Sequence, residues 1–285
     1  MSGKQYFLGL YEKAMPDLSW EEKLALTKRG GFDYMEISID ETDGKLARLD
    51  FGAEKLGAIK TAMAKTGVPI LTMCLSGHRK YPLGSHDPAV RARSLEIMEK
   101  AVDFAAAIGV RIIQLAGYDV YYEEGDAETV GYFSENLRKA TEMAAKKGVL
   151  LGFETMETPF LDTVEKGMAH VRAVNSPYLG MYPDIGNLKN AAVLYGTDVA
   201  ADLALGAGHT VAAHLKETKP GLYRDMLFGQ PDGHTEYDRC LAVLCGQGVR
   251  MFTGEFWYHG EENYVENIQN ASAFLREKIE KALVQ

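Results

Sequence analysis

Short apolar runs alternate with longer amphipathic stretches along the chain. The short runs have the length of strands, and they are residues 5–10, 32–37, 69–74, 111–116, 149–154, 178–184, 210–216 and 250–256. In the longer stretches apolar residues recur at steps of three and four, as at Ile97, Ala101 and Phe104, which indicates amphipathic helices. These predicted helices are residues 19–29, 53–66, 88–108, 126–147, 162–174, 190–206, 235–247 and 261–282.

Eight predicted strands that alternate with eight predicted helices describe a (β/α)8 TIM barrel of the α/β class. Glycine follows several of the helices, as expected at helix C-termini; examples are Gly67, Gly109 and Gly148. The chain has no linker, low-complexity segment or break in composition, so residues 1–285 are predicted to form one barrel domain. A doubly wound open sheet is the alternative, but no G-x-G-x-x-G motif follows the first strand.

Four potential metal ligands stand at the ends of consecutive predicted strands. They are Glu154, Asp184, His214 and Glu255, separated by steps of 30, 30 and 41 residues, about the length of one strand–helix unit. The C-terminal ends of barrel strands form the active-site face, so these side chains are expected to converge there. A single glutamate at a strand end is more often an ordinary polar residue. Several unpaired carboxylates at a barrel mouth, however, repel one another unless a cation lies between them, so the pattern predicts one divalent-metal site.

Side-chain alternation along the strands separates the barrel interior from the layer beneath the helices. Because successive side chains point to opposite faces, Lys216 shares the face of His214. The flanking apolar residues Phe153, Leu215 and Phe256 are then expected to point outward and pack under the helices.

Five longer segments carry a resemblance to a known family. They are residues 35–51, 73–87, 112–124, 181–188 and 214–230. In these segments, which include MYPDIGNL and HLKETKPGLYRDMLFGQ, the chain resembles the L-ribulose-5-phosphate 3-epimerase family, also called L-xylulose-5-phosphate 3-epimerases, within the xylose isomerase-like TIM barrels. Residues 230–240 depart from the family's shorter glycine–acidic turn, and the first strand and the C-terminal helix carry little of its signature.

The resemblance implies a metal-dependent enzyme that interconverts L-ribulose 5-phosphate and L-xylulose 5-phosphate by inverting carbon 3. A proton beside a carbonyl is only weakly acidic, and a divalent cation would stabilise the enediolate formed when that proton leaves. In similar sites both glutamates are ligands and also acid and base, so Glu154 and Glu255 are expected to exchange the C3 proton. Asp184 and His214 are implied as ligands only, and no organic cofactor is required. Manganese, zinc, magnesium and cobalt all suit this ligand set, and its oxygen-rich character favours manganese.

Basic residues in two loops are candidates for holding the substrate's phosphate. Lys216, Lys219 and Arg224 follow the seventh predicted strand, and barrels often bind phosphate in the loops after strands seven and eight. Lys216 is favoured because it shares the face of His214, whereas a solvated basic loop explains Lys219 equally well. Arg79, after the third strand, is a second candidate.

Other residues near the strand ends are expected to contact the sugar. Glu36 and Gln114 end the second and fourth strands and would line the pocket and bind hydroxyl groups. His78 offers a further hydroxyl contact, and Asn187 would support the metal ligands. Among the aromatic loop residues, Tyr11 and Trp257 are expected to close over the substrate.

Composition and charge exclude some classes of binding partner. The formal net charge of −9 argues against a nucleic acid or an acidic membrane surface, and no apolar run approaches the ~20 residues of a membrane span. The N-terminal segment lacks a signal peptide's long apolar region, and the three cysteines are not spaced as metal ligands, which together favour a cytoplasmic protein with reduced thiols. The expected partner is a small sugar phosphate. The oligomeric state stays open, with a homodimer as one expectation because barrels of this kind often dimerise.

Three other functions remain as alternatives. A metal-dependent isomerase, epimerase or dehydratase of an unphosphorylated sugar would leave the basic loop after the seventh strand without a purpose. A phosphodiester hydrolase with several metal ions would need more histidines at the strand ends than the sequence supplies. A non-catalytic sugar-binding module would not need an intact pair of acid and base residues.

Overall fold

The computed structural model describes residues 5–284 of the chain. Its strands are parallel and lie side by side in the order β6-β5-β4-β3-β2-β1-β8-β7. Their bounds are β1 Phe7–Tyr11, β2 Tyr34–Ile39, β3 Ile70–Leu75, β4 Ile112–Ala116, β5 Leu150–Glu154, β6 Leu179–Met181, β7 Ala213–Leu215 and β8 Met251–Gly254.

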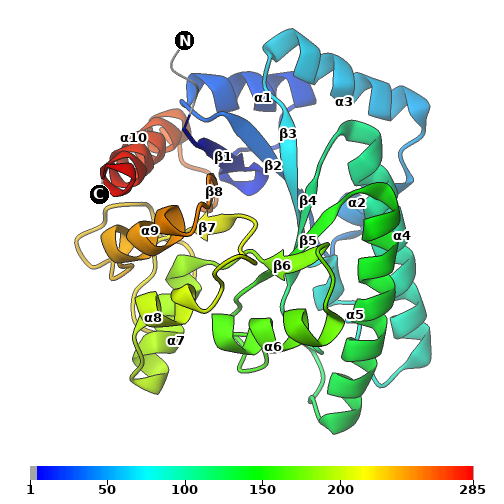
Figure 1. Cartoon of the computed structure of the whole chain (residues 1–285). Coiled ribbons are helices and arrows are strands. Elements are labelled where there is room, and N and C mark those ends of the chain that lie inside the picture. Colours follow the sequence, from blue (N-terminus) through cyan, green and yellow to red (C-terminus); the bar gives the residue numbers. More distant parts are fainter. Residues whose placement is uncertain (1–4, 285) are drawn as a thin grey trace.

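Helices surround the strands on the outside (Figure 1). Their bounds are α1 Trp20–Arg29, α2 Asp43–Leu46, α3 Ala53–Thr66, α4 Pro88–Ile108, α5 Ala127–Lys147, α6 Val164–Val174, α7 Ile185–Tyr195, α8 Val199–Ala204, α9 Tyr237–Gly246 and α10 Tyr264–Leu283. Short 3-10 helices follow β1, α2 and β3. They are η1 Glu12–Ala14, η2 Ala47–Asp50 and η3 Ser76–Arg79.

Strands β6 and β7 close the barrel through single bridges instead of a continuous ladder. Met181 pairs with Thr210, and Asp184 pairs with His214, both in parallel orientation. With this seam the eight strands form the predicted (β/α)8 barrel. Two of the expected metal ligands are therefore backbone neighbours across the closing seam.

Two predicted elements in this part of the chain differ from the structure. The predicted strand at 178–184 is shorter because Asp184 is the N-cap of α7, and its side chain accepts a hydrogen bond from the backbone N–H of Asn187 at 2.7 Å. The chain thus enters a helix directly after β6. The helix predicted at 190–206 is two helices, because Gly196 ends α7 in the left-handed conformation at φ 66°.

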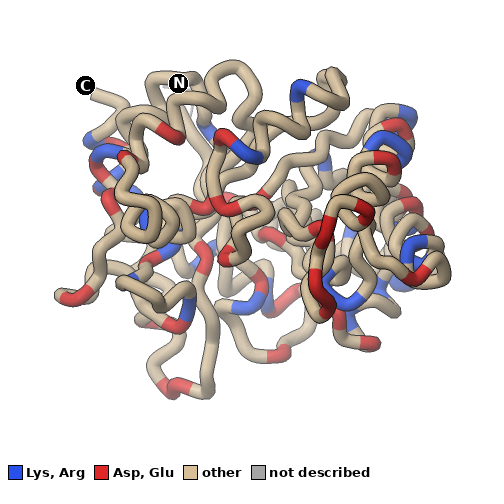
Figure 2. Tube along the Cα trace, turned by 90° about the horizontal axis from the view of Figure 1, so that it is seen from below, with Lys and Arg blue, Asp and Glu red and all other residues tan. Residues whose placement is uncertain are grey.

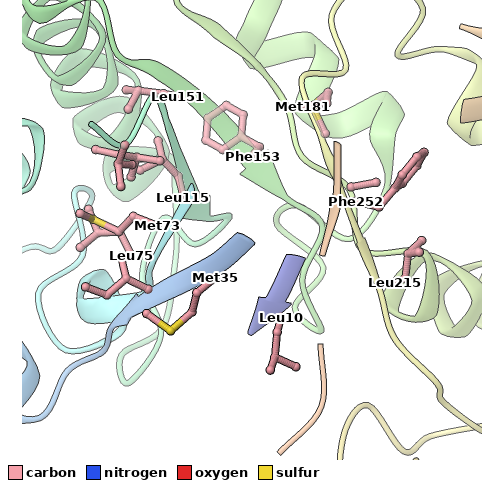
Figure 3. Packing of buried hydrophobic residues seen from close by; sticks show 14 of the residues in the cluster. Leu10, Met35, Met73, Leu75, Leu115, Leu151, Phe153, Met181, Leu215 and Phe252 are labelled. Carbon is pink, nitrogen blue, oxygen red and sulfur yellow. The ribbon is translucent and has the colours of Figure 1, made fainter. Parts of the chain in front are cut away.

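Apolar side chains fill the layer between strands and helices. Phe153 of β5 and Leu215 of β7 belong to one large buried cluster with Leu10 and Phe252, and all four are fully buried (Figure 3). This confirms that Phe153 and Leu215 point under the helices. A separate small cluster contains Ile112 and other residues of opposite alternation, so it lies on the inner side of the barrel.

The outer helices carry charges of both signs. Figure 2 shows basic and acidic residues interspersed around the periphery of the molecule. Among residues 5–284, none of the helices is long and apolar enough to cross a membrane.

Candidate metal centre

Glu154, Asp184, His214 and Glu255 converge on one buried point. Each offers a ligand atom, and these atoms all lie within 4.8 Å of one another. Glu154 is the last residue of β5, Glu255 directly follows β8, and His214 lies in the middle of β7. Asp184 reaches the same point from the N-cap position of α7, which follows β6 closely. The four expected ligands therefore meet, although only one of them is the last residue of its strand.

The atoms at this point suit a divalent cation. Nδ1 of His214 lies 3.4 Å from Oε1 of Glu154 and 3.3 Å from Oε2 of Glu255. Oδ2 of Asp184 and Oε2 of Glu255 are buried and accept no hydrogen bond. Three carboxylates that converge out of water are costly, and the single ammonium group of Lys216 beside them balances only part of their charge, so a divalent cation would remove the remaining cost. Three carboxylates and an imidazole are a ligand set that manganese, zinc, magnesium or cobalt accepts.

Lys216 belongs to this cluster. Its Nζ lies 3.1 Å from Oδ2 of Asp184 and 3.3 Å from Oε2 of Glu255, and the side chain is buried. It is also 5.9 Å from the centre of the Trp257 ring. The ammonium group thus neutralises part of the carboxylate charge beside the expected metal position. It also borders a cavity that is lined by Glu154, Glu255 and Trp257.

The pKa values of the two glutamates are shifted in opposite directions. Burial raises the pKa of Glu154, and Glu255 beside it raises that pKa further. Burial also raises the pKa of Asp184, to about 7, against the effect of Lys216. For Glu255, Lys216 and His214 outweigh burial and hold the pKa below its usual range. The two glutamates therefore have different electrostatic surroundings, because Lys216 and His214 act more strongly on Glu255 than on Glu154.

Residues expected to touch the sugar fall into two groups. Eight of them line the cavity above the cluster, and these are Tyr11, Arg79, Glu154, Asn187, Lys216, Arg224, Glu255 and Trp257. Glu36 and Gln114 are instead fully buried behind His214. Nε2 of the His214 ring lies 2.6 Å from Oε1 of Glu36, and the Gln114 amide nitrogen lies 3.1 Å from Nδ1. Both side chains contact a metal ligand and do not line the cavity.

His78 and Lys219 are also outside the cavity lining. His78 is buried with its Nε2 3.2 Å from the carbonyl oxygen of Ser94, and burial lowers its pKa to about 4. Lys219 is exposed, and its Nζ donates to Asp232 at 2.9 Å. Both residues were expected near the substrate because of the loops that carry them, and in this structure neither side chain lines the cavity.

Two arginines border the mouth of the cavity. The Arg79 guanidinium stacks on the Tyr121 ring at 4.8 Å and donates to the Tyr118 hydroxyl at 3.3 Å. Arg224 lies over the Trp257 ring at 5.8 Å. Glu157, which the sequence analysis did not single out, accepts from Tyr118 at 3.0 Å, and lies 3.6 Å from Arg224. The loops after β3, β4, β5, β7 and β8 are thereby connected around the opening.

A second, basic hollow adjoins the cavity and was also missed. Four cationic side chains line it, and these are Lys13, Lys23, Lys45 and Arg48. They outnumber its two carboxylates, Glu12 and Asp17. Lys13 and Trp257 line both the hollow and the cavity. These residues lie in η1, α1, α2 and η2, so a search restricted to strand ends could not find them.

Sequence comparison agrees with this geometry. The family described as xylose isomerase-like TIM barrel matches residues 24–278. Proteins named L-ribulose-5-phosphate 3-epimerase UlaE from Salmonella paratyphi A and Escherichia coli are 42% identical to this chain over 284 residues, covering 99% of the chain and 98% of each relative.

Structural comparison supports the same fold. A 3-keto-D-glucoside 4-epimerase, YcjR, from Escherichia coli superposes with a TM-score of 0.78 at 16% identity, covering 95% of this chain and 99% of the other. An L-ribulose 3-epimerase superposes with a TM-score of 0.76 at 18% identity, covering 98% and 95% of the two chains. The 42% identity to the relatives over nearly the whole chain, together with the family match over residues 24–278, shows that the chain belongs to the L-ribulose-5-phosphate 3-epimerase family of xylose isomerase-like TIM barrels.

Proposed function

We propose that this protein is a metal-dependent epimerase that interconverts L-ribulose 5-phosphate and L-xylulose 5-phosphate by inversion at carbon 3. The observation that carries the proposal is the convergence of Glu154, Asp184, His214 and Glu255 at a buried point under a polar cavity. The relatives at 42% identity carry the name of this activity, which supports the choice of substrate.

Glu154 and Glu255 are the proposed acid and base. Both carboxyl groups border the cavity, so one can accept the C3 proton while the other supplies one. Inversion requires that the proton leaves one face of carbon 3 and returns to the other, and two separate carboxyl groups meet that need. A divalent cation held by the four ligands would act as a Lewis acid that stabilises the charge of the enediolate.

Lys216 has a proposed role close to the reacting atoms. Its ammonium group lies between two ligand carboxylates and lines the cavity, so it can donate to a sugar oxygen that gains negative charge. Because the same group is already ion-paired with Asp184 and Glu255, we no longer assign the phosphate to it. This revises the expectation from the sequence.

The basic hollow is our proposed site for the phosphate end of the substrate. Its four cations face three carboxylates, because Glu12 and Asp17 line the hollow and Asp40 pairs with Lys13, so one positive charge is in excess. The hollow shares Lys13 and Trp257 with the cavity that borders the two glutamates, and this excess favours an anionic group there. Lys219 is paired with Asp232 on the surface and is a weaker candidate. Arg79 and Arg224 at the mouth are then available to enclose the sugar.

An enzyme for an unphosphorylated sugar remains the second candidate. Its support is the structural likeness to proteins titled as epimerases of free sugars, such as the L-ribulose 3-epimerase. The basic hollow beside the cavity favours the phosphorylated substrate over this alternative.

One experiment tests the proposal and separates it from the second candidate. Chelator-treated protein should lose C3 epimerisation of L-ribulose 5-phosphate, and added Mn²⁺, Zn²⁺, Mg²⁺ or Co²⁺ should restore it. The reloaded protein should have a higher kcat/KM for L-ribulose 5-phosphate than for L-ribulose. Full activity after metal removal would contradict the proposal, and preference for the free sugar would favour the second candidate.

A further inference from the structure

Glu36 is a fully buried carboxylate in the interior of the barrel. It lies in β2, its exposed fraction is 0%, and three polar side chains lie within hydrogen-bond distance of its carboxyl group. The Thr72 hydroxyl and the Tyr182 hydroxyl donate to Oε2 at 2.7 and 2.8 Å. The His214 ring nitrogen Nε2 lies 2.6 Å from Oε1. The two hydroxyl groups are donors, so Oε2 of the carboxyl group acts here as an acceptor.

No lysine or arginine compensates this charge. Within residues 5–284, the only ion-pair partner of the Glu36 carboxylate is His214. A buried carboxylate without a cation is costly, and such groups are retained where they serve a defined purpose. The contact of Glu36 with the imidazole ring of His214 is therefore the feature that such a purpose would involve.

The surrounding strands make room for a hydroxyl network that holds Glu36. The Thr253 hydroxyl lies 2.8 Å from the Tyr182 hydroxyl and 2.9 Å from that of Tyr34, so the network continues across the barrel. A Cβ atom at position 9 would lie 2.3 Å from the Tyr34 ring, and one at position 152 would lie 2.9 Å from Cβ of Tyr182. Glycines in β1 and β5 thus accommodate the two tyrosines, which fixes the carboxylate that they support.

We infer that Glu36 is the positioning residue that selects which nitrogen of His214 is free to bind metal. A carboxylate can only accept, so the proton of the neutral ring must lie on Nε2. Nδ1 then carries no proton, and it lies 3.4 Å from Glu154 and 3.3 Å from Glu255, where the other ligand atoms gather, with the Gln114 amide nitrogen beside it at 3.1 Å. The inference rests on the proposed metal centre and assigns Glu36 a role beyond contact with the sugar.

Two substitutions of Glu36 should weaken metal binding to different extents. Glu36→Leu removes the acceptor, so the ring loses its preference for the proton on Nε2. Glu36→Gln keeps one acceptor oxygen without the charge and presents an amide N–H₂ group to the hydroxyls of Thr72 and Tyr182. We expect Co²⁺ to bind Glu36→Leu roughly 10–100-fold more weakly than wild type, and Glu36→Gln to lie near the lower end of that range.

Asp162→Asn is a matched control. Asp162 is also a buried carboxylate, and it accepts from the Tyr195 hydroxyl and from Nζ of Lys166, but it lies outside the ligand cluster. Its substitution should lower thermal stability and leave Co²⁺ affinity unchanged. The comparison therefore separates loss of a buried carboxylate in general from loss of ring positioning.

The measurement is Co²⁺ affinity of the purified full-length chain by competition with a chromophoric chelator, together with the visible absorption of the bound ion. Weaker binding and an altered spectrum in the Glu36 variants, but not in Asp162→Asn, support the inference. Wild-type affinity and spectrum in Glu36→Leu overturn it; if that variant does not fold, the same result in Glu36→Gln overturns it. A wild-type chain that binds no Co²⁺ contradicts the proposed metal centre itself.

Discussion

Asp184 combines a structural and a chemical role in its two carboxylate oxygens. Oδ1 caps α7 by accepting from the backbone N–H of Asn187, while Oδ2 faces Lys216 and the other ligands. Helix capping alone therefore explains only one of the two oxygens. The buried position of the second, which accepts no hydrogen bond, is what links this residue to a metal.

Substitutions of Asp184 should separate these two roles. Asp184→Asn keeps the capping oxygen, so it should weaken metal binding with little loss of stability. Asp184→Ala should lose the metal and also about 1 kcal/mol of stability, because the helix loses its cap. Elemental analysis and denaturant unfolding measure the two effects. Full metal occupancy in Asp184→Ala would remove this residue from the ligand set.

The two glutamates should fail in different ways. If Glu154 and Glu255 act on opposite faces of the sugar, replacement of either by Gln should stop net epimerisation in both directions. One variant should still exchange the C3 proton of L-ribulose 5-phosphate with solvent, and the other that of L-xylulose 5-phosphate. NMR in deuterated water, with metal content measured in parallel, reports this exchange. Normal epimerisation by one metal-loaded variant would show that a single base suffices.

At the scale of single residues, strand-end position in the sequence identified the four side chains that converge. It did not predict what each neighbour touches. Glu36 and Gln114 were expected in the pocket because they stand at the ends of the second and fourth predicted strands, but both side chains are buried behind His214. Depth along the barrel axis depends on strand stagger, which a single sequence does not specify.

Glu12 joins the first elements of the barrel. It follows β1 and is buried, and its carboxylate lies 2.8 Å from Nζ of Lys23 in α1 and 2.9 Å from Nζ of Lys45 in α2. It also accepts from Arg48 in η2 at 2.7 Å and from the backbone N–H of Ser38 in β2 at 2.9 Å. One carboxylate thus holds together the elements that line the basic hollow.

Loss of the Glu12 charge should destabilise the fold. Glu12→Gln leaves buried cations unpaired, so unfolding should become easier by about 3–5 kcal/mol. Burial alone would raise the pKa of Glu12, but Arg48, Lys45 and Lys23 hold it below its usual range. Its contribution is therefore complete above the unfolded pKa of about 4.3 and declines as pH falls below that value. Denaturant unfolding at several pH values should show that Glu12→Gln loses less stability in acid than the wild-type chain does. The same dependence of stability on pH in both chains would contradict this prediction.

The elements that line the basic hollow should also determine the preference for the phosphorylated over the free sugar. Lys45→Met removes a cation from the hollow, so KM for L-ribulose 5-phosphate should rise roughly tenfold while activity on L-ribulose changes little, since a charge-assisted hydrogen bond contributes about 1.5–3 kcal/mol. Lys216→Met should instead reduce turnover of both sugars alike. Steady-state kinetics with the two substrates distinguishes these outcomes. Equal losses in Lys45→Met would exclude the hollow as the phosphate site.

Over the whole molecule, the alternation of strands and helices was sufficient to predict the barrel. The regular change of apolar period from strand to helix repeats along the chain, so it is a robust signal. The segment around β6 and β7 was less predictable because these strands are only three residues long and are joined by single bridges. The basic hollow escaped prediction since its cations come from η1, α1, α2 and η2, which the fold alone brings together.

The most direct test of the account is the fate of the C3 proton. Metal-loaded wild-type protein is incubated with L-ribulose 5-phosphate in deuterated water, and the position of incorporated deuterium is determined by NMR. A two-base epimerase predicts L-xylulose 5-phosphate with deuterium at carbon 3, formed only when metal is present. Deuterium at carbon 1 instead, or an epimerised product without any deuterium, would contradict proton exchange at carbon 3 by Glu154 and Glu255.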